Sequence, residues 1–137
     1  MIVANKLKTY AVRMLKEHLT DRVRRIESGG TMLVSRLSEH PHVLREHVLR
    51  LGVSVSRLYD ESLHQYCVKQ SLDRVGLQTV LTAVAKGVLH LHRNNVGHFD
   101  IKPNNVLIKW SHTRGIFEGT SVVLADFGLV NELKNGL

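Results

Sequence analysis

Four side chains in the C-terminal third of the chain have the chemistry of a phosphate-transfer site: Asp100, Lys102, Asn105 and Asp126. Carboxylate and amide oxygens are hard ligands that suit Mg²⁺, with phosphate oxygens and water completing its octahedron. A free carboxylate can orient an attacking hydroxyl and accept its proton, and a lysine can offset charge that develops on the transferred group. If the fold brings these residues together, the set suits metal-assisted phosphoryl transfer.

Two short apolar segments predict the hairpin that would position these side chains. Val106–Ile108 and Val122–Ala125 are expected strands. The segment between them holds the turn-forming and polar residues Ser111, His112, Gly115 and Gly119. Asp100 precedes the first strand and Asp126 follows the second, so an antiparallel hairpin would bring both carboxylates to the same end.

The clearest predicted element is a helix over Asp73–Arg93, just upstream of the polar cluster. Its N-cap is Ser71 or Asp73, and Gly97 follows where a turn belongs. Apolar residues recur at spacings of three, four and seven and define one wide face: Leu77, Val80, Leu81, Val84, Val88 and Leu91. A shorter helix is expected over Leu63–Val68.

The N-terminal half predicts a strand, a helix and further strands. Thr9–Leu15 alternates imperfectly and contains Tyr and Val, which favours a strand. Thr20-Asp21 can cap a helix, which Gly29-Gly30 should interrupt before it recovers and continues to Glu39. Val48–Tyr59 is rich in Val and Leu and is expected to form one or two strands.

Two ordered motifs resemble the eukaryotic-type protein kinase family. The catalytic-loop pattern H-R-D-L-x-x-x-N stands here as His98-Phe-Asp-Ile-Lys-Pro-Asn-Asn105, and the D-F-G triplet stands as Asp126-Phe127-Gly128. The resemblance implies that Asp100 is the catalytic base and that Asn105 and Asp126 bind the Mg²⁺ of Mg-ATP. It also implies that Lys102 contacts the transferred phosphate, as in the serine/threonine branch, and that His98 is structural.

The resemblance extends upstream to Tyr10-Ala11-Val12-Arg13, which is similar to the V-A-I-K strand. Ala11 would cover the adenine. Arg13 stands where the family has the lysine that holds the phosphates of ATP, and its planar fork is larger than an ammonium group. Lys16 is an odd number of residues away and should face the other side of the strand. The alternative is that Arg13 is an ordinary strand arginine.

Two further positions depart from the family pattern. Counting back from His40-Pro41 places Gly30 or Thr31 where the family has a helix glutamate that pairs with its lysine. Glu27, one turn earlier, is a substitute only if the glycines shift the helix. Phe99 replaces the arginine that reads an activation-loop phosphate in the family, so regulation by such a phosphate is not expected.

The implied fold is α+β, a partial two-lobed kinase-like fold. Residues 1–60 would form an incomplete N-lobe sheet and helix, and residues 61–137 the C-lobe helix, catalytic loop and β-hairpin. The chain is expected to cover the middle of a kinase domain, without the glycine-rich phosphate loop or the A-P-E motif. On that expectation it would be poorly stable and nearly inactive by itself.

The composition is that of a globular domain and excludes several classes of protein. Hydrophobic residues make up 43% of 137 residues, with no apolar run long enough for a membrane helix and no secretory signal at the start. A lone cysteine, Cys67, excludes a disulfide framework and favours an intracellular protein, cytoplasmic or nuclear. The spacing of His40, His42, His90 and His92 does not favour a metal site.

The net charge of +7 is compatible with a polyanionic partner, but the basic residues are scattered. The densest group is either a solvated helix face or a phosphate-facing patch: Arg22, Arg24 and Arg25. Aromatic residues make up only 5%, which does not favour stacking on nucleic-acid bases.

These observations favour a serine/threonine protein kinase-like domain that uses Mg-ATP and acts on a protein substrate. Two alternatives stay open: a non-catalytic kinase remnant that binds nucleotide or a partner, and a small-molecule phosphotransferase of related fold. The intact Asp126-Phe127-Gly128 and Lys102-Pro103 argue against the second alternative.

Overall fold

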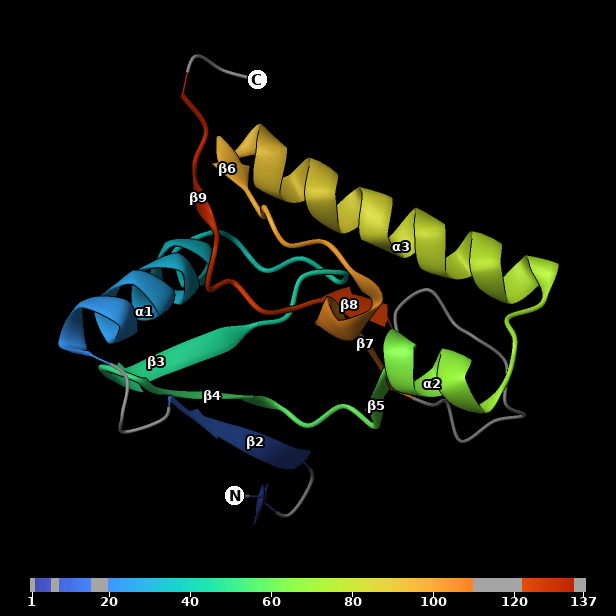
Figure 1. Cartoon of the computed structure of the whole chain (residues 1–137), viewed down its shortest axis with the longest axis horizontal. Helices are drawn as coiled ribbons and strands as arrows, with labels where there is room; N and C mark the ends of the chain where they lie inside the picture. Colours follow the sequence, from blue (N-terminus) through green and yellow to red (C-terminus); the bar gives the residue numbers. More distant parts are fainter. Residues whose placement is uncertain (1, 6–7, 16–19, 110–121, 135–137) are drawn as a thin grey trace.

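Figure 1 shows a computed structural model of the chain, which describes residues 2–5, 8–15, 20–109 and 122–134. The N-terminal half forms an antiparallel sheet with the strand order β1-β2-β4-β3. Its strands are β1 (Ile2–Asn5), β2 (Lys8–Met14), β3 (Glu46–Arg50) and β4 (Val53–Arg57). The predicted strand at 9–15 is confirmed, and the segment 48–59 contributes to two strands rather than one.

The described residues of the C-terminal half form two α-helices, one short 3₁₀ helix and two small sheets. Helices α2 (Leu63–Lys69) and α3 (Arg74–Arg93) confirm the two predicted helices. The predicted hairpin is also present. Its strands, β7 and β8, pair antiparallel and join β5 in one sheet, while β6 pairs with β9 in another. The strands are β5 (Glu61–Ser62), β6 (Val96–Gly97), β7 (Val106–Ile108), β8 (Val122–Leu124) and β9 (Asn131–Glu132). A short 3₁₀ helix, η1 (Pro103–Asn105), directly precedes β7.

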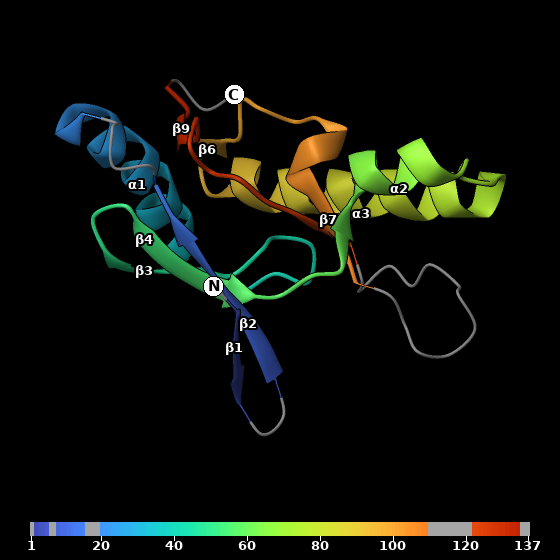
Figure 2. The same cartoon turned by 60° about the horizontal axis from the view of Figure 1, so that its bottom comes forward.

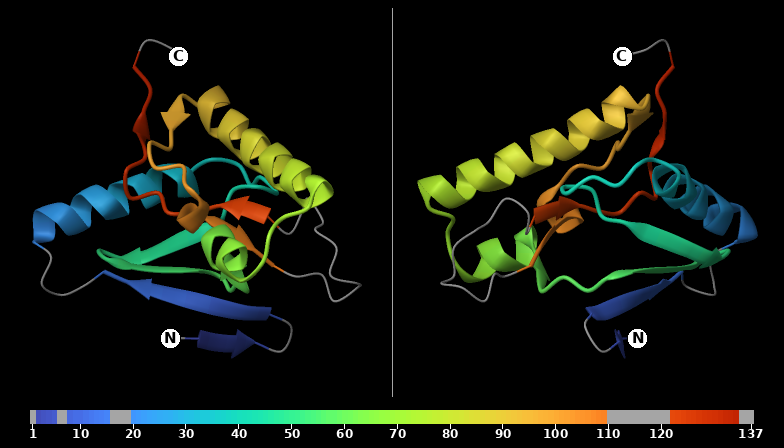
Figure 3. Two further views of the ribbon diagram at one scale, coloured as in Figure 1. Left: turned by 45° about the vertical axis from the view of Figure 1, so that its right-hand side comes forward. Right: turned by 180° about the vertical axis from the view of Figure 1, so that it is seen from behind.

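The β7–β8 hairpin lies between α3 and the four-stranded sheet, as Figures 1 and 3 show from several directions. In Figure 2 the β1–β2 strands project away from the helices of the C-terminal half. The expected boundary near residue 60 falls between β4 and β5 and stays a prediction. The turn residues predicted between the hairpin strands, Ser111 to Gly119, lie outside the described residues. Within the described part of the chain, no helix is long and apolar enough to cross a membrane.

Helix α3 begins where predicted, and its buried face overlaps in part with the predicted apolar face. The Asp73 carboxylate caps it by accepting a hydrogen bond from the Gly76 N–H at 2.6 Å. Val80 and Leu91 of the predicted apolar face are buried, whereas Leu77 and Leu81 are 48% and 59% exposed. The buried face combines small and apolar residues: Gly76, Val80, Ala83, Gly87 and Leu91. Small residues let the helix backbone approach its neighbours, so the buried face includes positions that the apolar pattern does not mark.

Helix α1 (Asp21–Ser35) is capped as predicted, because the Thr20 hydroxyl accepts a hydrogen bond from the Val23 N–H. The predicted interruption at Gly29-Gly30 and the predicted end at Glu39 are both wrong. The helix is continuous through the glycines and ends at Ser35. A β-carbon on Gly30 would lie 1.8 Å from the carbonyl oxygen of Phe127, so this position needs a residue without one. Close packing against Phe127 therefore offsets the low helix propensity of glycine.

The main core cluster joins the two halves of the molecule. The segment 42–44 runs alongside β8, with hydrogen bonds from the Leu124 N–H to the His42 carbonyl and from the Leu44 N–H to the Leu124 carbonyl, both 2.9 Å. Phe127, Leu91 and Leu124 are fully buried in this cluster. The segment around Asp126 is thus anchored by the core on either side of it.

Candidate functional site

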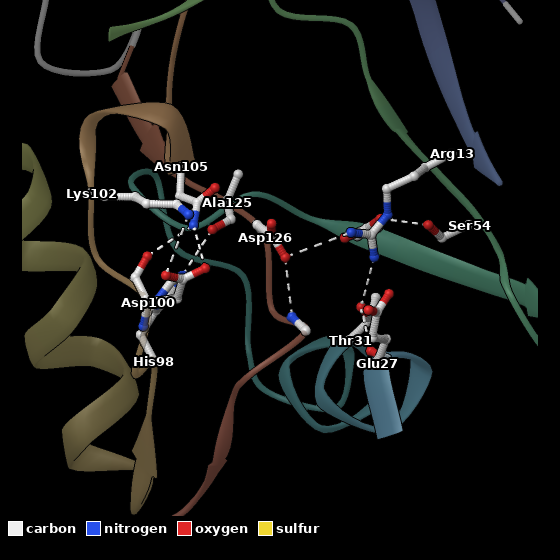
Figure 4. Close-up of polar contacts among 12 residues, drawn as sticks. Arg13, Glu27, Thr31, Ser54, His98, Asp100, Lys102, Asn105, Ala125 and Asp126 are labelled. Carbon is white, nitrogen blue, oxygen red and sulfur yellow. Dashed lines mark hydrogen bonds and ion pairs between the residues drawn. The ribbon is translucent and has the colours of Figure 1, made fainter. Parts of the chain in front are cut away.

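The β7–β8 hairpin brings the predicted site residues to one end, as expected from their placement. Val106 pairs with Leu124, so the residues before β7 and after β8 meet beyond that pair. The Ala125 N–H donates to the Asn105 carbonyl at 2.8 Å. Figure 4 shows Asp126 between the Asp100–Asn105 group and Arg13. The hairpin therefore places both carboxylates and the amide in one region.

The buried Asn105 side chain fixes the position of Asp100. Its amide nitrogen donates to the Asp100 backbone carbonyl at 2.8 Å and to the Asp100 Oδ2 at 3.0 Å. The Asn105 N–H also donates to the Lys102 carbonyl within η1. Because both amide hydrogen bonds point toward Asp100, the amide oxygen of Asn105 faces away from it. That oxygen is the Asn105 atom that would bind Mg²⁺.

His98 connects the same loop to the strand that precedes Asp126. Its Nδ1 accepts a hydrogen bond from the Asp100 N–H at 3.1 Å, and its Nε2 lies 2.8 Å from the Ala125 carbonyl oxygen. Both contacts fit one neutral tautomer, in which Nε2 carries the proton and donates. The ring is buried and lies edge-on to Phe127, with 6.0 Å between centroids. These contacts give His98 a positioning role.

Two residues of the site hold left-handed backbone conformations although neither is glycine. Phe99 has φ 65° and Asp126 has φ 58°. Such conformations cost roughly 1–3 kcal/mol each and persist where the surrounding structure over-determines them. Here the His98 and Asn105 hydrogen bonds and the buried Phe127 hold the flanking backbone. The strained backbone therefore lies next to Asp100, at Phe99, and at Asp126 itself.

Charged side chains pair across the site. The Lys102 ammonium lies 3.6 Å from the Asp100 Oδ1, and both groups are partly exposed. The Asp126 Oδ1 accepts a hydrogen bond from the Gly128 N–H at 3.2 Å and lies 3.8 Å from an Arg13 guanidinium nitrogen. The site thus holds two acidic and two basic groups. The acids suit a metal ion, and the bases suit the phosphates of a polyphosphate ligand.

Ala11 and Arg13 occupy the same face of β2. They pair with Ser56 and Ser54 of β4, and residues two apart along a strand share a face. The Arg13 guanidinium donates to the Thr31 hydroxyl at 3.2 Å. The sequence placed either Gly30 or Thr31 at the position of the family's helix glutamate. Of these two residues, Thr31 is the one that contacts Arg13. Lys16 lies outside the described residues.

The acid that pairs with Arg13 is not the one proposed from the sequence. Among the described residues, no ion pair joins Arg13 to Glu27, whose side chain instead lies against Gly128. Arg13 pairs with the buried Glu46 of β3, with 3.1 Å between Nε and Oε1. Glu46 was not predicted from the sequence, because the Val- and Leu-rich pattern places the start of the strand at Val48 whereas β3 begins at Glu46. The available signal was strand alternation: in a strand that starts at residue 46, Glu46 and Val48 are two residues apart and share a face.

Comparison with known proteins agrees with the motifs. The sequence matches the family model described as a protein kinase domain over residues 4–137. It is 36% identical over 110 residues to the human serine/threonine-protein kinase/endoribonuclease IRE2, covering 76% of this chain and 12% of that protein. It is 30% identical over 137 residues to the membrane-associated tyrosine- and threonine-specific cdc2-inhibitory kinase wee-1.3 of Caenorhabditis briggsae, covering 92% and 19%.

A third relative is the calcium/calmodulin-dependent protein kinase type I of Schizosaccharomyces pombe, which is 25% identical over 131 residues. That match covers 89% of this chain and 37% of the relative. The chain therefore spans between about a tenth and two fifths of the length of these three relatives.

Proposed function

This chain belongs to the protein kinase family, and on that premise we propose that it binds Mg-ATP at the end of the β7–β8 hairpin. We further propose that the site is built to transfer the terminal phosphoryl group to a serine or threonine hydroxyl of a protein. The observation that carries the proposal is the Asp100–Asn105 pair, held 3.0 Å apart beside the Asp126 turn.

The residues of the site fit Mg²⁺ by their donor chemistry. Asn105 offers an amide oxygen that faces away from Asp100, and Asp126 offers a partly exposed carboxylate. Both are hard oxygen ligands of the kind that Mg²⁺ combines with phosphate oxygens and water. Asn105 and Asp126 would hold the ion, which when bound supplies positive charge to the phosphate oxygens.

Asp100 is placed to accept the proton of the attacking hydroxyl. One carboxylate oxygen is held by the Asn105 amide and the other lies near the Lys102 ammonium, so its orientation is fixed before substrate binds. Lys102 is half-exposed and can move its ammonium to the transferred phosphate. On the sheet side, Ala11 would contact the adenine and Arg13 the phosphates. Catalysis would come mainly from positioning and charge.

The test is calorimetric titration of the 137-residue chain with ATP, with Mg²⁺ and with EDTA. We expect Mg²⁺ to strengthen binding, and Asp126→Asn to remove most of that gain. Glu132→Gln, an exposed acid on β9, should behave like the wild type. Asp100→Asn should keep nucleotide binding and lower any transfer to a protein substrate by about 10²–10⁴-fold, the usual contribution of a general base. Absence of Mg²⁺-dependent binding would refute the proposal.

Nucleotide binding without transfer is the second candidate. The specific observation in its favour is that the residue of α1 that contacts Arg13 is the uncharged Thr31, where the family has a glutamate. Mg-ATP binding with no transfer above the Asp100→Asn background would support this candidate and exclude the first for this chain.

A further inference from the structure

The Arg13 guanidinium is held by three elements of the fold at once. Its Nε lies 3.1 Å from the Glu46 carboxylate on β3, and another nitrogen donates to the Thr31 hydroxyl on α1 at 3.2 Å. A third nitrogen lies 3.8 Å from Asp126. These three contacts use different nitrogens of the fork, so together they define both its position and its plane.

Glu46 is the one buried acid in this set, at 5% exposure. A buried carboxylate needs hydrogen-bond donors and a cation, because desolvation penalises the unpaired charge. The Ser54 hydroxyl donates a hydrogen bond to the Glu46 oxygen that faces Arg13. Ser54 lies on β4, between the strands that carry the two charged residues. The pair is thus built into the sheet and bridges a whole strand.

The contact to helix α1 is of a weaker kind. Thr31 offers a neutral hydroxyl, and its own proton is directed to the Glu27 carbonyl. Both contacts are charge-assisted because the guanidinium is charged, but only Glu46 adds a full opposite charge to the hydrogen bond. The energetic anchor of Arg13 is therefore Glu46 in the sheet rather than the helix.

From these contacts we infer that Glu46 is the positioning residue for Arg13, and that it holds the guanidinium where its remaining N–H groups meet the phosphates of the nucleotide. This inference rests on the proposed function, because it concerns how the same site reads phosphate. Since β2 and β3 belong to one sheet, the position of Arg13 depends little on helix α1.

Two variants separate the sheet anchor from the helix contact. Glu46→Gln keeps the shape and one acceptor oxygen but removes the charge, and Thr31→Val removes the neutral hydroxyl, which accepts from Arg13 and donates to the Glu27 carbonyl. Binding of ADP and of adenosine is measured in EDTA, so that metal ligands do not contribute. We expect Glu46→Gln to weaken ADP binding about tenfold and Thr31→Val about threefold or less, because the first variant removes an opposite charge and the second only a neutral partner. Adenosine affinity should not change in either variant.

A double-mutant cycle distinguishes positioning from a general loss of structure. In an Arg13→Met background, Glu46→Gln should no longer affect ADP affinity, because the group on which it acts is absent. An effect of equal size in both backgrounds, or an equal loss of adenosine binding, would mean that Glu46 merely supports the sheet. Unchanged or tighter ADP binding by Glu46→Gln would also overturn the inference, since Glu46 would then compete with the phosphates.

The Arg13 side-chain NMR signal provides a check if a variant is unstable. We expect an Nε–H signal protected from exchange in the wild type and lost in Glu46→Gln, with Thr31→Val retaining it. If the wild-type chain binds neither ADP nor Mg-ATP, the proposed function fails. If it binds both and Glu46→Gln binds equally well, only the inference about Glu46 fails.

Discussion

The backbone of Gly30 touches the carbonyl of Phe127, so closely that a β-carbon at position 30 would lie 1.8 Å from the Phe127 oxygen. This contact sets the distance between helix α1 and the Asp126-Phe127-Gly128 turn. Helix α1 carries Thr31, the next residue, which contacts Arg13. The absence of a side chain at Gly30 therefore determines how α1 sits beside the candidate site.

Gly30→Ala should destabilise the chain and displace α1. Overpacking a buried contact costs about 1–3 kcal/mol, and here the obstacle is backbone rather than a flexible side chain. Urea unfolding of the 137-residue chain measures the change. The matched control is Gly29→Ala, which would meet no atom within 4 Å and should stabilise the helix by about 0.5–1 kcal/mol. Equal effects of the two substitutions would contradict the Gly30–Phe127 contact.

Two leucines of α3 that share the same apolar pattern should respond differently to truncation. Leu91 is fully buried in the main core, and Leu91→Ala is expected to cost about 2–5 kcal/mol. Leu81 is 59% exposed, and Leu81→Ala should change the free energy of unfolding by no more than about 0.5 kcal/mol. Chemical denaturation of both variants checks this. Comparable losses would contradict the exposure of Leu81.

Neighbouring asparagines in η1 should differ in their effect on the site. Asn105→Ala removes both amide hydrogen bonds to Asp100 and a proposed metal ligand. We expect it to abolish the gain in ATP affinity that Mg²⁺ provides and to lower stability by about 1 kcal/mol. Asn104 is exposed, and Asn104→Ala should leave both properties as in the wild type. Calorimetry with and without Mg²⁺ separates the two outcomes.

The stability of the chain should fall as the pH drops below neutrality, in part through His40. Burial lowers the pKa of His40 from its ordinary value of 6.5, and the neighbouring His90, His42 and Lys86 lower it further. A lowered pKa means that the folded chain binds this proton less readily than the unfolded chain does. The contribution of His40 is therefore complete above pH 6.5 and is lost as the pH falls toward the pKa in the folded state.

The measurement is the urea midpoint between pH 7.5 and pH 5. His40→Gln should show a shallower decline than the wild type, because it removes the imidazole whose pKa burial lowers on folding. His64→Gln, on the exposed surface of α2, provides the control and should decline like the wild type. A decline as steep in His40→Gln as in the wild type would assign the effect to other groups.

Local patterns in the sequence determined much of the secondary structure and the membership of the site. Thr20 and Asp73 cap their helices as predicted, because an N-cap acts within one turn. The apolar segments before and after the polar clusters form the β7–β8 hairpin, which alone suffices to bring Asp100, Asn105 and Asp126 to one end. These features depend on neighbours in the chain or on one antiparallel pairing.

Only the tertiary structure decided which surfaces meet. The buried face of α3 includes Gly76, Ala83 and Gly87, and a β-carbon on Gly87 would lie 2.7 Å from the His42 carbonyl oxygen, a close approach that hydrophobicity does not record. The two-residue strands β5, β6 and β9 are too short to carry a pattern of their own. Glu46 became the partner of Arg13 because β4 lies between their strands and places a small serine beneath the pair. Such long-range contacts depend on strand order and on packing distance, neither of which is encoded in the spacing of residues along the chain.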